Sequence, residues 1–182
     1  MNYEIIIAGF GGQGILAFGQ ILSYGALKEG KQTTWFPAYG PEQRGGTANC
    51  TVVVGDEEVA SPISSEPDVV VVLNQPSLDK FESWLKKGGV LLVNKSLIAR
   101  KPERTDVKVV EVEALAIARQ AGEERASNIV LLGRLLKELP ILSLSTVGEV
   151  LIEFFSHRGE GVVKANQEAL RLGWESGEES IR

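Results

Sequence analysis

The 182-residue sequence contains very little cysteine and histidine, with one residue of each. Cys50 has no second thiol with which to form a disulfide bond, and one thiolate cannot hold an iron–sulfur cluster, which takes about four. The lone histidine, His157, has no serine in an elbow motif to pair with, and we expect it at a solvated helix end. We therefore expect neither a metal site nor a self-sufficient set of catalytic residues.

Long apolar runs and an excess of positive charge are also missing. No apolar stretch approaches the roughly 20 residues of a membrane-spanning helix, and the short apolar run near the start ends in glycines and follows no basic segment. With 19 Lys and Arg against 24 Asp and Glu, the net charge is -5, which argues against nucleic acid as a partner. We expect a cytoplasmic protein, in keeping with the single cysteine.

Apolar residues, by contrast, are plentiful. They make up 43% of the sequence, which is enough for a substantial core without disulfide bonds. The length suits one globular domain. We predict a single domain over residues 1–174, followed by a polar tail over residues 175–182.

Short β-branched runs alternate with amphipathic segments over the first two-thirds of the chain. This alternation is typical of a mostly parallel sheet with helices on its faces. Two strand-like pieces, 49–54 and 57–60, are joined by Gly55-Asp56 and predict a β-hairpin. The remaining strands are predicted at 4–8, 32–36, 68–73, 90–93 and 107–112, and helices at 15–30 and 76–87.

From about residue 113 the pattern changes to helices. Ser145 is a candidate N-cap for one of them, and Gly173 is a candidate C-cap for the last, which is predicted over 162–172. The expected fold is therefore α/β, a Rossmann-like three-layer domain with a mostly parallel sheet, an inserted β-hairpin and a helical C-terminal third.

The segment Gly9-Phe10-Gly11-Gly12-Gln13-Gly14 has the Gly-x-Gly-x-x-Gly spacing directly after a strand and before a helix. Glycines at this spacing permit a tight turn, let backbone approach a ligand and let the helix pack on the strand. The free N–H groups of the helix start then favour a phosphate. The alternative is that the glycines serve only close packing of helix on strand.

A nicotinamide site meets an objection at the second strand. Such a site uses an acidic residue there, roughly 20 residues after the glycines, to hold the ribose hydroxyls. The strand end is Trp35-Phe36-Pro37-Ala38-Tyr39, which has no carboxylate, and the nearest acid is Glu42. The sequence therefore disfavours NAD.

The loop Tyr39-Gly40-Pro41-Glu42-Gln43-Arg44-Gly45-Gly46 places an aromatic ring, an acid, an amide and a guanidinium among glycines and a proline. Loops after the carboxyl ends of strands commonly carry ligand sites in α/β sheets. Arg44 is suited to bind a phosphate or carboxylate with two hydrogen bonds. In the alternative interpretation this is a surface loop in which Arg44 pairs with Glu42.

Three other residues have weaker claims to a function. Cys50 begins an apparent strand and is expected to be a small buried residue. Asn128 and Asn166 stand near helix starts, where capping is the expected role and contact with a ligand is the alternative.

Two of these motifs occur together in a known family. The Gly9–Gly14 turn followed by the run from Tyr39 to Cys50 resembles the gamma subunit of 2-oxoacid:ferredoxin oxidoreductases. The later pattern Asn166-x-x-Ala169-x-x-x-Gly173 is also similar to that family. The resemblance extends over residues 3–174.

The resemblance implies an enzyme subunit that is inactive alone, in an assembly that converts a 2-oxoacid to an acyl-CoA and reduces ferredoxin. It implies alpha, beta and delta subunits as partners, with thiamine diphosphate and iron–sulfur clusters held by them and coenzyme A bound in the assembled enzyme. An isolated chain is expected to be able to form a homodimer. Motif matching assigns cofactor binding to Gly9, Gly11, Gly12, Gln13, Gly14, Tyr39, Gly40, Pro41, Glu42, Arg44, Gly45 and Gly46.

The resemblance leaves the 2-oxoacid open. Tyr39, Gln43 and the run from Gly46 to Cys50 are more similar to the 2-oxoglutarate and branched-chain types than to the pyruvate type, and we favour 2-oxoglutarate. The beta subunit of indolepyruvate oxidoreductase shares the glycine turn and is one alternative. A free-standing nucleotide-sensing module is another, and a scaffold whose glycine turn binds nothing is a third.

Overall fold

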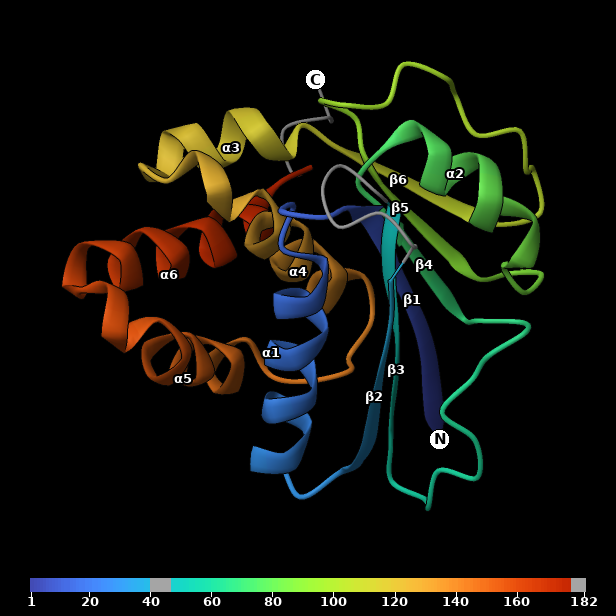
Figure 1. The fold of residues 1–182 in the computed structure, drawn as a ribbon, viewed down its shortest axis with the longest axis horizontal. Helices are drawn as coiled ribbons and strands as arrows, with labels where there is room; N and C mark the ends of the chain where they lie inside the picture. Colours follow the sequence, from blue (N-terminus) through green and yellow to red (C-terminus); the bar gives the residue numbers. More distant parts are fainter. Residues whose placement is uncertain (40–46, 178–182) are drawn as a thin grey trace.

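The computed structural model describes residues 1–39 and 47–177. They form an α/β domain with a six-stranded sheet in the order β2-β3-β1-β4-β5-β6, and helices cover both faces (Figure 1). The strands are β1 (Asn2–Phe10), β2 (Gln32–Tyr39), β3 (Thr47–Gly55), β4 (Val69–Val72), β5 (Val90–Asn94) and β6 (Lys108–Val112). The predicted α/β, Rossmann-like class is confirmed.

The sheet is mixed. Strands β1, β4, β5 and β6 pair in parallel, whereas β3 runs antiparallel between β1 and β2. The predicted hairpin of 49–54 with 57–60 is wrong, because β3 continues to Gly55 and residues 56–60 form no strand. Both edges of β3 are already occupied by β1 and β2, so β3 has no free edge for a third partner. The consecutive strands that pair antiparallel are instead β2 and β3.

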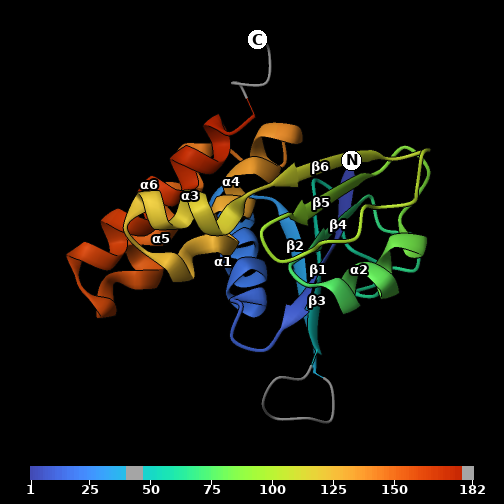
Figure 2. The same ribbon diagram turned by 90° about the horizontal axis from the view of Figure 1, so that it is seen from above.

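Strand β1 is the centre of the core. The run Ile5–Ala8 is buried on both faces, as its unbroken apolar sequence predicts. Helix α1 (Ile15–Lys28) covers one face of β1 and β3, and α2 (Gln75–Phe81) covers the other face over β1 and β4. Figure 2 shows α1 and the C-terminal helices together on one side of the sheet and α2 on the opposite side.

The helical C-terminal third contains α3 (Ala114–Ala121), α4 (Ser127–Glu138), α5 (Leu144–Phe155) and α6 (Glu160–Glu175). Short 3-10 turns, η2 (Glu124–Ala126) and η3 (Ser156–Arg158), precede α4 and α6. The segment predicted as one helix over 76–87 is α2 followed by a third 3-10 turn, η1 (Glu82–Trp84), after which Leu85 is extended.

Two predicted caps are wrong. Ser143, not Ser145, caps α5, because its Oγ accepts the Thr146 N–H at 3.2 Å. Gly173 lies inside α6, and a Cβ there would overlap the backbone of Val130 in α4. Gly133 of α4 faces the backbone of α6 in the same way, so these glycines allow a close crossing of the two helices. Helix α6 also continues to Glu175, the first residue of the predicted tail.

Within residues 1–39 and 47–177, no helix is long and apolar enough to cross a membrane.

Candidate functional site

The glycine turn, residues 9–14, begins in the last two residues of β1 and leads into α1 at the carboxyl end of the sheet (Figure 1). After β1 the chain passes to α1 on one face, whereas after the adjacent parallel strand β4 it passes to α2 on the other. The carboxyl ends of β1 and β4 therefore meet where the direction of winding changes. Open α/β sheets bind their ligands at this position.

The turn holds its own shape. Gly12 and Gly14 have positive φ angles of 90° and 75°, which favour glycine. The Gln13 N–H donates to Phe10 O at 3.2 Å, and the Phe10 N–H donates to Gln13 Oε1 at 2.6 Å. Gln13 Nε2 also donates to Leu73 O at 3.3 Å, which ties the turn to the end of β4. The Gln13 side chain thus stabilises the turn.

The glycines of the turn differ in what surrounds them. A Cβ on Gly9 would press against Gln13 and Ile15, and a Cβ on Gly14 would overlap Asn128 Nδ2. A Cβ on Gly12 would meet no atom within 4 Å. Packing therefore accounts for Gly9 and Gly14, whereas Gly12 leaves backbone open to a ligand.

Asn128 connects the turn to the C-terminal helices. Its Nδ2 donates to Gly14 O at 3.0 Å, across 114 residues of sequence, and its Oδ1 accepts the Ile129 N–H at 2.9 Å. The side chain is only 5% exposed. Both polar atoms are used within the protein, so Asn128 fixes the start of α4 against the start of α1.

Two hollows flank the turn and share Gly12 and Arg125. The first, which we call the glycine-turn pocket, has a volume of about 280 Å³ and is lined by Gly12, Gly14, Ala17, Glu123, Arg125, Asn128, Phe155, Arg158 and Asn166. The second, which we call the strand-end pocket, has a volume of about 270 Å³ and is lined by Gly12, Gln13, Leu73, Asn94, Leu97, Leu115, Glu124, Arg125 and Ser127.

The second predicted motif reaches the same edge of the sheet. Ala48 of β3 pairs with Gly9 of β1 on one side and with Tyr39 of β2 on the other. The exposed Tyr39 therefore ends its strand level with the start of the glycine turn. The other candidate residues of that loop, Gly40, Pro41, Glu42, Arg44, Gly45 and Gly46, lie outside the described residues.

Cys50 and Trp35 occupy the interior between β2, β3 and α1. A Cβ on Gly19 of α1 would overlap both Cys50 Sγ and Trp35 Nε1, so the three residues meet at one point. Burial raises the pKa of the Cys50 thiol to about 12. The predicted role of Cys50 as a small buried residue agrees with this environment, in which the thiol stays protonated.

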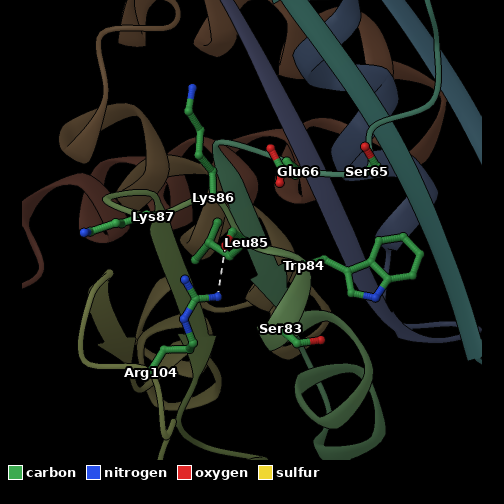
Figure 3. Close-up of a pocket in the computed structure, with 8 residues that line it drawn as sticks. All are labelled: Ser65, Glu66, Ser83, Trp84, Leu85, Lys86, Lys87 and Arg104. Carbon is green, nitrogen blue, oxygen red and sulfur yellow. Dashed lines mark hydrogen bonds between the residues drawn. The ribbon is translucent and has the colours of Figure 1, made fainter.

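A larger hollow of about 580 Å³ lies at the opposite, amino end of the parallel strands. Figure 3 shows its lining residues, Ser65, Glu66, Ser83, Trp84, Leu85, Lys86, Lys87 and Arg104. Arg104 Nη1 donates to Leu85 O at 2.9 Å, the bond drawn in Figure 3, and Arg104 Nε pairs with Asp106 at 2.6 Å. Lys86 Nζ pairs with Asp68 at 3.3 Å. Two of the three cations that line this hollow, Lys86 and Arg104, therefore already form ion pairs within the protein.

Sequence reasoning missed Arg125 and Arg158, which line the glycine-turn pocket from η2 and η3. Neither residue belongs to a motif, and only the folded chain brings them beside a turn more than a hundred residues earlier. Asn166 lies inside α6 and does not cap its start, so the predicted capping role is wrong for this residue, which lines the same pocket.

Known proteins resemble the whole described chain. Residues 4–176 match the family described as pyruvate ferredoxin/flavodoxin oxidoreductase. The ketoisovalerate oxidoreductase subunit VorA of Methanothermobacter thermautotrophicus is 42% identical over 98% of this chain and 37% of its own length. The 2-oxoglutarate synthase subunit KorC of Methanocaldococcus jannaschii is 34% identical over 98% of this chain and 96% of its own. The chain thus spans well under half of the first relative and nearly all of the second.

Solved structures give the same assignment. The gamma subunit of a keto/oxoacid ferredoxin oxidoreductase from Geobacter sulfurreducens is 31% identical, with a TM-score of 0.80 over 95% of this chain and 96% of that one. The 2-oxoglutarate:ferredoxin oxidoreductase of Magnetococcus marinus, with 2-oxoglutarate, coenzyme A and succinyl-CoA bound, is 25% identical, with a TM-score of 0.87 over 96% of this chain and 30% of that one. The resemblance inferred from the two motifs is confirmed, and the chain belongs to the pyruvate ferredoxin/flavodoxin oxidoreductase family, with the fold of its gamma subunits.

Proposed function

We propose that this chain is the gamma component of a 2-oxoacid:ferredoxin oxidoreductase and is inactive alone. The observation that carries the proposal is its end-to-end correspondence with separate gamma subunits, together with a glycine turn at the position where the winding of the sheet reverses. In such an assembly, thiamine diphosphate and the iron–sulfur clusters are held by partner subunits. The buried Cys50 thiol is unsuited to ligate a cluster.

We infer a branched-chain 2-oxoacid as the first candidate substrate. Two relatives named ketoisovalerate oxidoreductase subunits are 42% and 46% identical to this chain. Relatives named 2-oxoglutarate synthase subunits are 32% to 34% identical. The loop beginning at Tyr39 favours 2-oxoglutarate or a branched-chain acid over pyruvate, so 2-oxoglutarate is the second candidate.

For the site, we propose that the glycine turn and the loop from Tyr39 to Gly46 form one edge of a coenzyme A site. Gly12 would offer open backbone to the ligand, whereas Gly9, Gln13 and Gly14 would maintain the shape of the turn. The support is the shared row of Gly9, Ala48 and Tyr39, and the coenzyme A bound in the Magnetococcus marinus enzyme.

We propose alpha, beta and delta subunits as partners, ferredoxin as the acceptor reached through the complex, and the cytoplasm as the location. A homodimer of the isolated chain remains a prediction, which size-exclusion chromatography with light scattering tests directly.

The deciding experiment is reconstitution. The chain is purified alone and together with thiamine-binding subunits from its native cell, and each sample is assayed for viologen reduction with 2-oxoisovalerate, 2-oxoglutarate and pyruvate. We expect no turnover by the chain alone and coenzyme A-dependent turnover by the complex, fastest with 2-oxoisovalerate. Turnover without partners, or failure to co-purify with them, would contradict the proposal. A preference for 2-oxoglutarate would overturn only the substrate.

A further inference from the structure

The arginines of the described residues fall into two groups. One group pairs with carboxylates, and its members are Arg100 with Asp79 and Glu82, Arg104 with Asp106, Arg119 with Glu124, Arg134 with Glu138, and Arg171 with Glu168 and Glu175. Arg125 and Arg158 form the second group, because neither has a carboxylate partner within residues 1–39 and 47–177. Both line the glycine-turn pocket.

These two guanidinium groups reach the pocket from separate elements. Arg125 lies in η2, which leads into α4, and Arg158 ends η3, which leads into α6. The Arg158 guanidinium lies 5.9 Å from the centre of the Phe155 ring, another lining residue, so a cation–π contact holds it near the pocket.

The start of α1 adds to the positive potential. Its N-cap, Gly14, supplies no side-chain hydrogen bond, and Gly12, Gly14 and Ala17 all line the pocket. The first N–H groups of a helix carry a partial positive charge and bind phosphate when no side chain caps them. Two unpaired guanidiniums therefore face the same space as an uncapped helix start.

Asn166, a buried residue, supplies a polar side chain to the same space. Its side chain is only 3% exposed, and its Nδ2 donates to Val162 O at 2.9 Å. Its Oδ1 has no partner among the residues that the structure describes, although the residue lines the pocket. This oxygen is available to accept an N–H or O–H of a ligand.

One carboxylate, that of Glu123, also lines the pocket and opposes an anion. Its Oε1 accepts the Arg125 backbone N–H at 3.1 Å, so it caps η2 and leaves both guanidiniums unpaired. The charges lining the pocket then sum to +1, from two arginines and one glutamate.

The size of the pocket limits what it can hold. Drug-sized ligands occupy pockets of about 300–1,000 Å³, and this one has about 280 Å³. It accommodates a diphosphate group, while the remainder of a nucleotide-derived molecule extends beyond it.

We propose that Arg125 and Arg158 bind the diphosphate of a nucleotide-derived cofactor in the glycine-turn pocket, against the start of α1. Asn166 Oδ1 accepts a hydrogen bond from the same molecule. The diphosphate site follows from the pocket itself, and its assignment to coenzyme A rests on the proposed function.

The test uses inorganic pyrophosphate and the 182-residue chain, with binding followed by titration calorimetry and by amide chemical shifts of Gly12, Gly14 and Ala17. We expect saturable binding that weakens as salt is added. Arg125→Ala and Arg158→Ala should each weaken it by about tenfold or more, as expected for loss of a charge-assisted hydrogen bond. Lys87→Ala is the matched control, because it removes one positive charge at the other end of the sheet, and it should leave the affinity unchanged.

Absence of saturation, unchanged affinity in both arginine variants, or an equal loss in Lys87→Ala would overturn the proposal. Coenzyme A and NADH are then titrated in parallel. Binding of coenzyme A with the same dependence on Arg125 and Arg158 supports both the pocket and its cofactor. Binding of NADH but not coenzyme A, with that dependence, supports the diphosphate site and contradicts the coenzyme A part of the proposed function.

Discussion

The two ends of the sheet use arginine in opposite ways. Beside α2, Glu82 is buried and accepts hydrogen bonds from Arg100 Nη2 at 2.8 Å and from the Arg104 N–H at 3.0 Å. At the carboxyl end, Arg125 and Arg158 face a smaller hollow with no carboxylate partner among the residues described. The larger hollow is lined by three cations, and two of them, Lys86 and Arg104, already form ion pairs within the protein. We therefore base the proposed binding site on unpaired charge and not on volume.

The comparison predicts its largest effect at Glu82. Glu82→Ala leaves the Arg100 guanidinium and two backbone N–H groups without their acceptor, and we expect a loss of about 3 kcal/mol in the free energy of unfolding. Urea denaturation measures this loss. Glu103→Ala is the control, since that carboxylate is exposed and 3.8 Å from Arg100, and it should cost less than about 0.5 kcal/mol. Equal effects of the two variants would show that the buried Glu82 carboxylate stabilises the fold no more than an exposed one.

The same carboxylate predicts a pH dependence. Burial raises the pKa of Glu82, but the hydrogen bonds from Arg100 and from the Arg104 and Glu103 N–H groups outweigh it and hold the pKa below 4.5. A lowered folded-state pKa stabilises the protein above pH 4.5, and this stability is lost as the pH falls through the folded-state value. The stability difference between the wild type and Glu82→Gln should therefore be constant near neutral pH and shrink in acid. A difference that grows in acid would contradict the assignment.

A smaller effect should separate two glycines within the turn. Gly14→Ala places a Cβ against Asn128 in a left-handed conformation, and we expect a loss of about 2 kcal/mol in stability. Gly12→Ala has the conformational cost alone, about 1 kcal/mol, because no atom lies within 4 Å. Thermal and urea unfolding of the two variants give the comparison. A larger loss for Gly12→Ala would show that the turn is packed differently.

The smallest effect is expected for the two unpaired arginines. Because Arg125 and Arg158 are exposed and form no ion pair within the described part of the chain, their replacement by alanine should change the free energy of unfolding by less than about 0.5 kcal/mol. A loss of unfolding free energy comparable to that of Glu82→Ala would show that Arg125 and Arg158 stabilise the fold. The arginines at the two ends of the sheet would then not differ in role.

Local patterns were sufficient to predict most of the fold. The run Ile5–Ala8 predicts a doubly buried strand, and Gly30 predicts the end of α1, where it has φ 71°. The hairpin prediction failed because Gly55-Asp56 suits a hairpin turn as well as the end of a single strand. Only the pairing of β3 with β1 and β2 shows that the strand ends there. That pairing is long-range, so no local signal contains it.

The site was predictable only in part for the same reason. The glycine turn has a fixed spacing and was found, and the row through Gly9, Ala48 and Tyr39 brings the second motif to the same edge. Gln13 was expected to contact a ligand, but its amide bonds to Phe10 and Leu73. Arg125 and Arg158 belong to no motif. They stand out only because they lack a carboxylate partner among the described residues of the folded structure, and a sequence does not show which side chains pair.

The crossing of α4 and α6 at Gly133 and Gly173 has a consequence for the pocket. The two backbones touch without intervening side chains, so α4 and α6 pack directly against each other and carry Asn128 and Asn166, while the start of α1 contributes Gly14 and Ala17 to the pocket. A single methyl group added at Gly173 would separate the two helices and shift Asn166 relative to Asn128. The dimensions of the glycine-turn pocket thus depend on a contact between two helix backbones outside the pocket lining.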